Sequence, residues 1–305
     1  MAAAARMKPN HEASDVLDRL KHWAEHHDSI RAMLLTSTRA NPNAAMDVFS
    51  DYDVVLVVRD IHPLFEDRSW LHDFGDVLVT YWDPIYLAPH YGIEQFGNVI
   101  QYADGLHIDF TLWPIELLRR IKESKTLPAD LDVGYMVLID KDNLTAGMQP
   151  PTYAAYIPKR PTEEIFQKVI EDFFSDVPYV AKCLLRDELM PAKWCLDFDM
   201  KHVFLRQMLE WRVELDHDWS APAGNLGKGL KKKMPLRIWS ALEKTYVGAG
   251  ISENWDALFG TISLFREVGM EVATGLGFVY PVDLDHRVTT FAQKMRDPNS
   301  EEEGE

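Results

Sequence analysis

Two aspartates, separated by one residue, stand immediately before a run of apolar residues. Asp51 and Asp53 lead into Val-Val-Leu-Val-Val at residues 54–58, and this composition predicts a buried strand over residues 53–58. Side chains two residues apart on a strand point to the same side, so we expect the two carboxylates to be neighbours. Adjacent negative charges are unfavourable unless a cation bridges them, and hard oxygen ligands suit magnesium. The competing interpretation is an acidic pair in an ordinary turn before a strand.

A third carboxylate lies in a second β-rich segment, residues 106–113. Asp109 is near its middle and shares a predicted strand face with Thr111 and Trp113, whereas the alternate apolar residues take the other face. A carboxylate inside such a segment is costly without a partner. Next to the Asp-x-Asp pair, Asp109 would complete a three-carboxylate site that holds two metal ions about 3.5–4 Å apart and stabilises an in-line phosphoryl displacement. The alternative is an aspartate that faces solvent on an edge strand.

A short polar turn follows the first predicted strand, residues 30–35. Ser37 and Thr38 offer backbone N–H groups and hydroxyls that can donate to a phosphate, and Arg39 would be a charge-assisted partner. The alternative is an ordinary polar loop, because Asn and Pro continue the segment through residues 41–43. The turn is therefore a candidate phosphate-binding segment.

A mixed sheet must hold these residues, and the first half of the chain predicts one. Apolar segments favour strands at residues 30–35, 53–58, 77–82, 98–102 and 106–113, and a helix over residues 14–26 with Ser14 as its N-cap. Because strands and helices mix, we expect an α/β domain over residues 1–150.

The second half of the chain predicts helices without strands. Prolines punctuate a linker at residues 150–161, and helical periodicity favours helices at residues 163–189, 198–215, 236–246 and 255–276. The expected fold class is α+β, with an all-helical domain at residues 151–296 after the mixed-sheet domain. The acidic tail, residues 297–305, is predicted to be disordered.

Charge and cysteine content exclude several classes of protein. The formal net charge is −16, which argues against nucleic-acid binding and permits a cationic partner. Cys183 and Cys195 lack zinc-site spacing, so we expect free thiols in a reducing cytoplasm. Residues 1–10 lack the apolar core of a signal peptide, and no apolar stretch is long enough to span a bilayer. We therefore expect a cytoplasmic protein with no membrane partner.

The order of motifs along the chain resembles that of the aminoglycoside 6-adenylyltransferases, also called streptomycin adenylyltransferases. The segments that carry the likeness are residues 34–43, Phe49-Ser50-Asp51-Tyr52-Asp53, Trp70-Leu71, Phe74-Gly75, Asp104-Gly105, Asp109-Phe110-Thr111-Leu112, Pro114, Leu138-Ile139-Asp140-Lys141-Asp142, Lys159-Arg160-Pro161-Thr162, Lys182, Arg186, Glu188-Leu189, the lysine-rich residues 228–232, Gly275-Leu276 and Tyr280-Pro281. They cover most of the chain in order, which is more specific than any single motif.

The resemblance implies a nucleotidyltransferase fold followed by a helical domain that closes over the site and binds the acceptor. It implies magnesium-dependent transfer of AMP from ATP to a hydroxyl of a streptomycin-like aminoglycoside, an antibiotic inactivation. Asp51 and Asp53 would then be metal ligands and Asp109 the third carboxylate, and the acceptor hydroxyl would be activated by Asp109 or a nearby carboxylate.

The helical half contributes a lysine-rich stretch and one acidic candidate. The resemblance implies that Lys228, Lys231 and Lys232 lie toward the triphosphate, although a lysine run is otherwise a solvated helix face. Glu188 is expected on the apolar face of the helix at residues 163–189. A carboxylate there could have a raised pKa and orient or deprotonate the acceptor hydroxyl, or instead pair with an arginine between helices.

One departure from the family pattern leaves two further interpretations open. The family has Gly-Ser-Arg after the first strand, and this chain has Ser37-Thr38-Arg39. Glycine lets a backbone approach phosphates closely, so the change bears on nucleotide affinity, and a non-catalytic nucleotide-binding protein is one alternative. The other is the same transfer to a different acceptor, namely a lincosamide, another metabolite or a protein hydroxyl.

Overall fold

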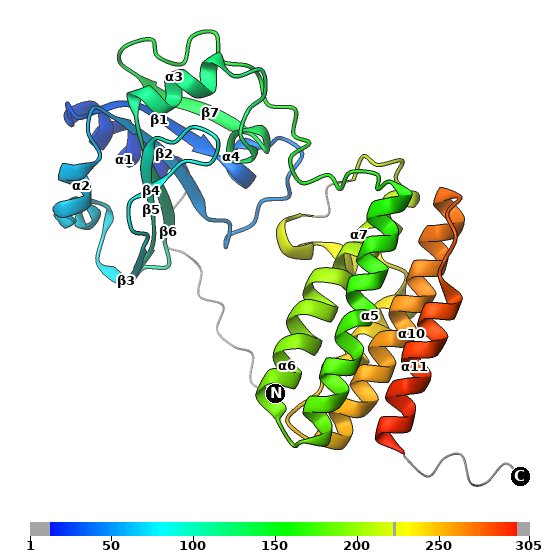
Figure 1. Ribbon diagram of the computed structural model, residues 1–305. Coiled ribbons are helices and arrows are strands. Elements are labelled where there is room, and N and C mark those ends of the chain that lie inside the picture. The colour runs from blue at the N-terminus through cyan, green and yellow to red at the C-terminus, as the bar shows by residue number, and fades with distance from the viewer. Residues whose placement is uncertain (1–12, 222–223, 298–305) are drawn as a thin grey trace, which may run out of the picture. The chain divides into compact units, whose positions relative to one another are not determined.

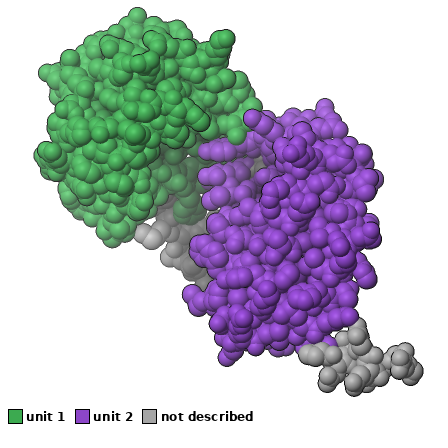
Figure 2. All heavy atoms as spheres, viewed as in Figure 1, with its two compact units in different colours: residues 1–155 green, residues 156–305 purple. Residues whose placement is uncertain are grey.

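The computed structural model describes residues 13–221 and 224–297. The chain divides into two compact units, residues 1–155 and 156–305, which Figure 2 shows in different colours. Of the predicted acidic tail, all residues except Asp297 lie outside the described part. Within that part, no helix is long and apolar enough to cross a membrane.

The first unit is built on a seven-stranded sheet in the order β3-β5-β6-β2-β1-β7, with β4 paired to β5 (Figure 1). The strands are β1 (Ile30–Thr36), β2 (Tyr52–Val58), β3 (Val77–Trp82), β4 (Tyr86–Leu87), β5 (Glu94–Tyr102), β6 (His107–Pro114) and β7 (Tyr135–Asp140). Strands β2 and β6 pair in parallel, and the other pairs are antiparallel. All five predicted strands are present, and β4 and β7 were not predicted.

The helical elements of this unit pack on both faces of the sheet. They are α1 (Ala13–His26), η1 (Ser37–Ala40), α2 (His62–Glu66), η2 (Ser69–Phe74), α3 (Ile115–Glu123) and α4 (Ala129–Asp132). One core cluster packs α1 and η2 against one face of β1, β2 and β6. A second cluster packs α3 against the other face of these strands. Central strands buried on both sides explain why β1 and β2 read as continuous apolar runs.

Helix α1 already includes the residue before its predicted cap. Because α1 includes Ala13, Ser14 lies inside the helix, and its prediction as the N-cap was wrong. An N-cap residue has non-helical dihedral angles and therefore precedes the first helical residue.

In its described residues the second unit contains helices and no strand, which confirms the predicted α+β class. Its elements are α5 (Glu163–Leu185), α6 (Leu189–Lys193), η3 (Trp194–Leu205), α7 (Arg206–Leu215), η4 (Asn225–Gly227), α8 (Leu230–Lys233), α9 (Leu236–Thr245), α10 (Ile251–Leu276) and α11 (Val282–Arg296). One core cluster joins them, with Phe173 of α5 stacked on Phe265 of α10 at 3.7 Å between ring centroids.

The helix predicted at residues 198–215 has a different internal geometry. Residues 194–205 form the π-helix η3, which runs without a break from α6 into α7. A π-helix has i→i+5 hydrogen bonds, and such segments are usually short and often occur at functional sites.

Candidate active site

Parallel pairing of β2 and β6 brings the predicted carboxylates together. The register of the two strands sets Asp53 directly opposite Asp109, and Asp51 lies just before the first residue of β2. Ile108, Phe110 and Leu112 of β6 face the core on the opposite side of the sheet, as predicted. Three carboxylates from two adjacent strands therefore gather at one place.

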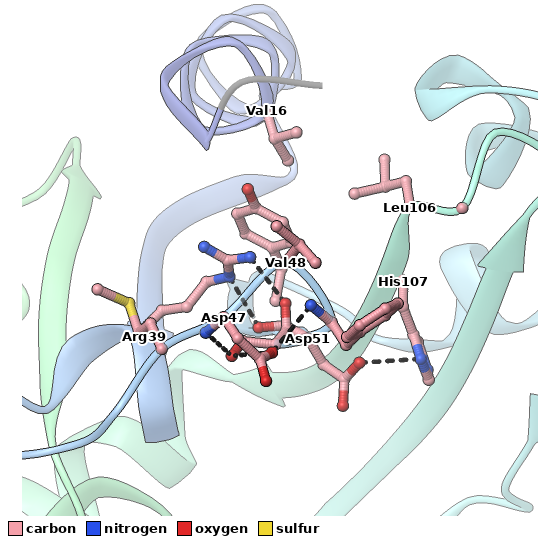
Figure 3. Close-up of a pocket in the computed structure, with 12 residues that line it drawn as sticks. Val16, Arg39, Asp47, Val48, Asp51, Leu106 and His107 are labelled. Atoms are coloured by element: carbon pink, nitrogen blue, oxygen red, sulfur yellow. Dashed lines mark hydrogen bonds and ion pairs between the residues drawn. The ribbon is translucent and has the colours of Figure 1, made fainter. Parts of the chain in front are cut away.

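His107, the first residue of β6, lies between two of these carboxylates and was not predicted. Its Nδ1 is 3.0 Å from Oδ1 of Asp51, and its Nε2 is 3.0 Å from Oδ1 of Asp109. Figure 3 shows Asp51 and His107 side by side in a pocket of the first unit. The signal was available in the sequence, because residues two apart on a strand share a face and His107 precedes Asp109 by two.

The carboxylates repel one another and are partly withdrawn from water. Burial, followed by the charges of Asp109 and Asp51, raises the pKa of Asp53 to about 6, while the hydroxyl of Ser37 donates to its carboxylate and opposes the rise. Burial also raises the pKa of Asp109, and His107 opposes it. Both shifts show that negative charge is costly here, and a divalent cation would remove that cost.

Two buried polar atoms at this place lack a hydrogen bond among the described residues. They are Oδ1 of Asp109 and Nε2 of His107. The two atoms are 3.0 Å apart and form an ion pair when His107 is protonated. Carboxylate oxygens that are buried and unsatisfied suit a hard cation such as magnesium. Asp51, Asp53 and Asp109 supply three carboxylates, the kind of ligand that a divalent cation prefers, but among the described residues they do not bring one oxygen each within 4.8 Å of the other two.

The turn after β1 lies against the same carboxylates. Ser37 has a positive φ of 62°, its N–H donates to the carbonyl of Gly134 at 3.0 Å, and its hydroxyl donates to Asp53. A left-handed conformation favours glycine, which gives a physical reason for glycine at this place in the family pattern. The structure thus places Ser37 at the site and in a strained backbone conformation.

Arg39 of η1 lies beside the carboxylates but is occupied by backbone contacts. Its Nε donates to the carbonyl of Asp51 at 3.0 Å, and its Nη2 donates to the carbonyl of Ser50 at 2.7 Å. The guanidinium lies 3.7 Å above the ring of Tyr52.

A pocket of about 330 Å³ opens beside these residues and is lined by Arg39, Asp51 and His107 (Figure 3). The segment before β2 forms one wall, where the side chain of Phe49 is 70% exposed. Exposed apolar side chains, those of Met46, Val48 and Phe49, therefore lie in the same pocket as the charged residues.

Glu188 is not on the helical face where it was predicted. Helix α5 ends at Leu185, and Asp187 has a positive φ of 59°. The N–H of Asp187 donates to the carbonyl of Leu184, and that of Glu188 donates to the carbonyl of Cys183. These two bonds form a Schellman motif with Asp187 at the left-handed position. Glu188 is exposed at the start of α6.

The three lysines predicted to face a triphosphate belong to the second unit. Lys228 follows η4, and Lys231 and Lys232 are exposed in α8. Nζ of Lys231 is 2.8 Å from Oε1 of Glu243. Of the predicted site residues, the first unit contains Asp51, Asp53, Asp109, Ser37 and Arg39, which lie close together, and Thr38, which follows Ser37 in η1. Glu188 and the three lysines belong to the second unit.

Among the described residues, one group of three possible metal ligands has closely placed ligand atoms, and it lies in the helical unit. Asp176 of α5 and Cys195 and Asp199 of η3 offer ligand atoms that all lie within 4.8 Å of one another. Burial and the charge of Asp199 raise the pKa of Asp176 to about 6. Burial and Asp176 also raise the pKa of the Cys195 thiol, so this thiol is a weak nucleophile.

Comparison with known proteins decides the family. The family model described as streptomycin adenylyltransferase matches residues 10–295. The chain belongs to this family. Aminoglycoside 6-adenylyltransferase of Bacillus subtilis (strain 168) is 30% identical over 280 residues, which is 92% of this chain and 96% of that protein. The protein of the same name from Campylobacter jejuni is 28% identical over 283 residues, covering 92% and 95%.

The chain is also similar to a solved structure. The crystal structure of an aminoglycoside 6-adenyltransferase from Bacillus subtilis is 25% identical, covers 94% of this chain and 99% of that one, and has a TM-score of 0.44. The family assignment rests on the matched sequence and confirms the resemblance seen in the motifs. As a member of the streptomycin adenylyltransferase family, the chain is a nucleotidyltransferase.

Proposed function

We propose that this enzyme transfers AMP from ATP to a hydroxyl of a streptomycin-like aminoglycoside, with magnesium, and so inactivates the antibiotic. The observation that carries the proposal is the pairing of Asp53 with Asp109 on adjacent parallel strands, with raised pKa values for both carboxyls. A buried like-charge pair of this kind is expected where a cation binds.

Asp51, Asp53 and Asp109 would hold the metal in this proposal. A bound divalent ion neutralises these carboxylates and stabilises charge on the phosphoryl oxygens during an in-line displacement. Thr38 is proposed to donate to the phosphates from the turn after β1, and the Ser37 hydroxyl, which donates to Asp53 in this structure, is proposed to do so once the nucleotide is bound. The acceptor hydroxyl oxygen bonds to the α-phosphorus, the bond to pyrophosphate breaks, and the hydroxyl proton passes to Asp109 or a neighbouring carboxylate.

The second unit is proposed to bind the acceptor. Lys228, Lys231 and Lys232 are proposed to attract the triphosphate, and Glu188 to orient the acceptor hydroxyl. Exposure of all four side chains leaves them accessible to substrate. The names of the relatives support an aminoglycoside acceptor, and a net charge of −16 suits a polycationic one. Because the reaction consumes ATP, we place it in the cytoplasm.

Incubation with ATP, magnesium and an acceptor panel, followed by mass spectrometry, tests the proposal. We expect the mass of streptomycin-like aminoglycosides to increase by one AMP, with release of pyrophosphate and loss of the product in EDTA. Modification of a lincosamide alone would assign a different acceptor. ATP binding without any product would favour a non-catalytic nucleotide-binding protein. Asp53→Asn is the matched inactive control.

A further inference from the structure

We propose that Arg39 is a positioning residue for Asp51 and is not a ligand of the nucleotide phosphates. The inference rests on the proposed metal role of Asp51. The sequence favoured a phosphate contact for Arg39, because arginine commonly forms charge-assisted bonds to phosphates. The contacts of its guanidinium support the other role.

The guanidinium of Arg39 bonds to the main chain at the two residues that lead into β2. Nε donates to the carbonyl of Asp51 at 3.0 Å and Nη2 donates to the carbonyl of Ser50 at 2.7 Å. The planar arginine fork can donate to two acceptors at once with little loss of side-chain entropy per bond. Arg39 thereby fixes the direction of the Ser50 and Asp51 carbonyls, and with them the start of the Asp51 side chain.

The ring of Tyr52 fixes the plane of this fork. The carbon at the centre of the guanidinium is 3.7 Å from the ring centroid, which is a cation–π contact. Tyr52 is 5% exposed and belongs to the core of the first unit, so the ring is held by packing. Because Tyr52 is itself the first residue of β2, the support under the guanidinium is as rigid as the sheet.

Asp51 needs such support because it lies outside the ladder of the sheet. The segment before it is held by local contacts, such as the N–H of Asp47 donating to Oγ of Ser50 at 3.0 Å. The pairing of β2 with β6 begins at Tyr52. His107 contacts the Asp51 carboxylate, while Arg39 holds its main chain. Metal ligands depend on such outer contacts, whose removal typically weakens metal affinity by about 10–100-fold.

Measuring metal affinity without nucleotide distinguishes a positioning role of Arg39 from a purely electrostatic one, because the two predict opposite changes in that affinity. Arg39→Gln removes a positive charge beside the carboxylates, so a purely electrostatic effect would tighten Mn²⁺ binding. Loss of positioning would weaken it. We expect Arg39→Gln to weaken Mn²⁺ binding about tenfold or more in titrations followed by electron paramagnetic resonance, with no ATP present. Arg39→Lys should also weaken it, because one ammonium cannot reproduce the fork.

A second variant tests the same idea with the charge retained. Tyr52→Leu keeps the positive charge of Arg39 but removes the ring that supports its guanidinium. It should therefore also weaken Mn²⁺ binding. Arg59→Gln, at the far end of β2, is the matched arginine control and should leave the Mn²⁺ affinity unchanged. Circular dichroism and thermal unfolding of each variant confirm that the fold is intact before titration.

The outcomes distinguish this inference from the proposed function. If Asp51→Asn and Asp53→Asn leave Mn²⁺ affinity unchanged, the metal site is wrong and both proposals fail. If those two variants lose affinity while Arg39→Gln binds Mn²⁺ as tightly as the parent or more tightly, and only its KM for ATP rises, Arg39 is a phosphate ligand. The positioning role is then overturned and the proposed function stands.

Discussion

Asp53 and Asp109 occupy directly opposite positions on the parallel strands β2 and β6. Like charges at opposite positions of adjacent strands destabilise a sheet, and burial adds to the cost of ionising each carboxyl. The pairing therefore lowers the stability of the protein when no cation is bound. A cation bound beside the pair would offset this repulsion.

Replacing one carboxylate of this pair should separate activity from stability. We expect Asp53→Asn to lower AMP transfer more than about a hundredfold, because a charged group at the reaction centre is lost. At pH 7.5, above the folded-state pKa of about 6, the same change should raise the free energy of unfolding in EDTA, because a buried like charge is removed. Urea denaturation and initial rates measure the two effects.

Asp18→Asn provides a matched control for this prediction. Asp18 is on α1, and its side chain is 75% exposed, so neither activity nor stability should change appreciably. Unchanged turnover in a folded Asp53→Asn variant would contradict the assignment of Asp53 as a metal ligand.

The positive φ of Ser37 predicts an order of stability among its variants. Both Ser37→Gly and Ser37→Ala remove the hydroxyl that donates to Asp53, but only glycine relieves the left-handed conformation at φ 62°. Ser37→Gly should therefore be more stable than Ser37→Ala by about 1 kcal/mol in urea denaturation. We also expect it to retain or improve AMP transfer, because glycine allows a closer approach to phosphates. A clear rise in its KM for ATP would show that the Ser37 hydroxyl contacts the nucleotide.

Asp176 should give the stability of the protein a specific dependence on pH. Its folded-state pKa is raised to about 6, chiefly by burial and secondly by Asp199, from an ordinary value of 3.8 in the unfolded chain. The folded state therefore binds this proton more tightly, so its contribution to stability is complete below about pH 4 and is lost as pH rises through 6. Asp176→Asn cannot titrate and should gain stability relative to the parent as pH rises from 4 to 7.

The neighbouring aspartate provides the second arm of this test. Asp199→Asn removes one cause of the raised pKa but leaves burial, so it should reduce the pH dependence only in part. Chemical denaturation of the parent and both variants at several pH values measures the differences. A parent-minus-Asp176→Asn difference that stays constant from pH 4 to 7 would show that Asp176 ionises normally in the folded protein.

The sequence predicts the strands that hold the site better than the contacts that complete it. Continuous apolar runs place β1 and β2 because both faces of these strands are buried. Strand β7 was missed, because it lies at the edge of the sheet and exposes Met136 and Val137, so no alternation marks it. The register that sets Asp53 opposite Asp109 is a long-range pairing, which local periodicity does not specify.

Backbone conformation explains the remaining differences. The left-handed residue Asp187 ends α5 and turns Glu188 away from the predicted helical face, yet aspartate is not a strong marker of that conformation in a sequence. The π-helical hydrogen bonding of residues 194–205 shifts the helical register without a change in composition. The backbone contacts of Arg39 depend on how its turn folds against β2, so the sequence indicated only its charge.

Ionic strength should separate the two substrates, because the proposed acceptor is a polycation and ATP is an anion. The chain has a net charge of −16, and a negative surface attracts cations over distances set by the Debye length. This length falls from about 30 Å at 0.01 M salt to about 8 Å at 0.15 M. We expect kcat/KM for streptomycin-like acceptors to fall over this range. The value for ATP should rise or change little, since repulsion is screened and Lys228, Lys231 and Lys232 act locally.

The measurement is the initial rate as a function of salt, with each substrate varied in turn at fixed free magnesium. Lys231→Gln and Lys232→Gln should raise the KM for ATP and weaken its salt dependence if these side chains attract the triphosphate. A value of kcat/KM for the acceptor that is flat or rises with salt would mean that the acidic composition serves solubility alone. Electrostatic capture of the acceptor would then be wrong, while the metal site at Asp51, Asp53 and Asp109 would be unaffected, because it depends on contacts shorter than any Debye length in this range.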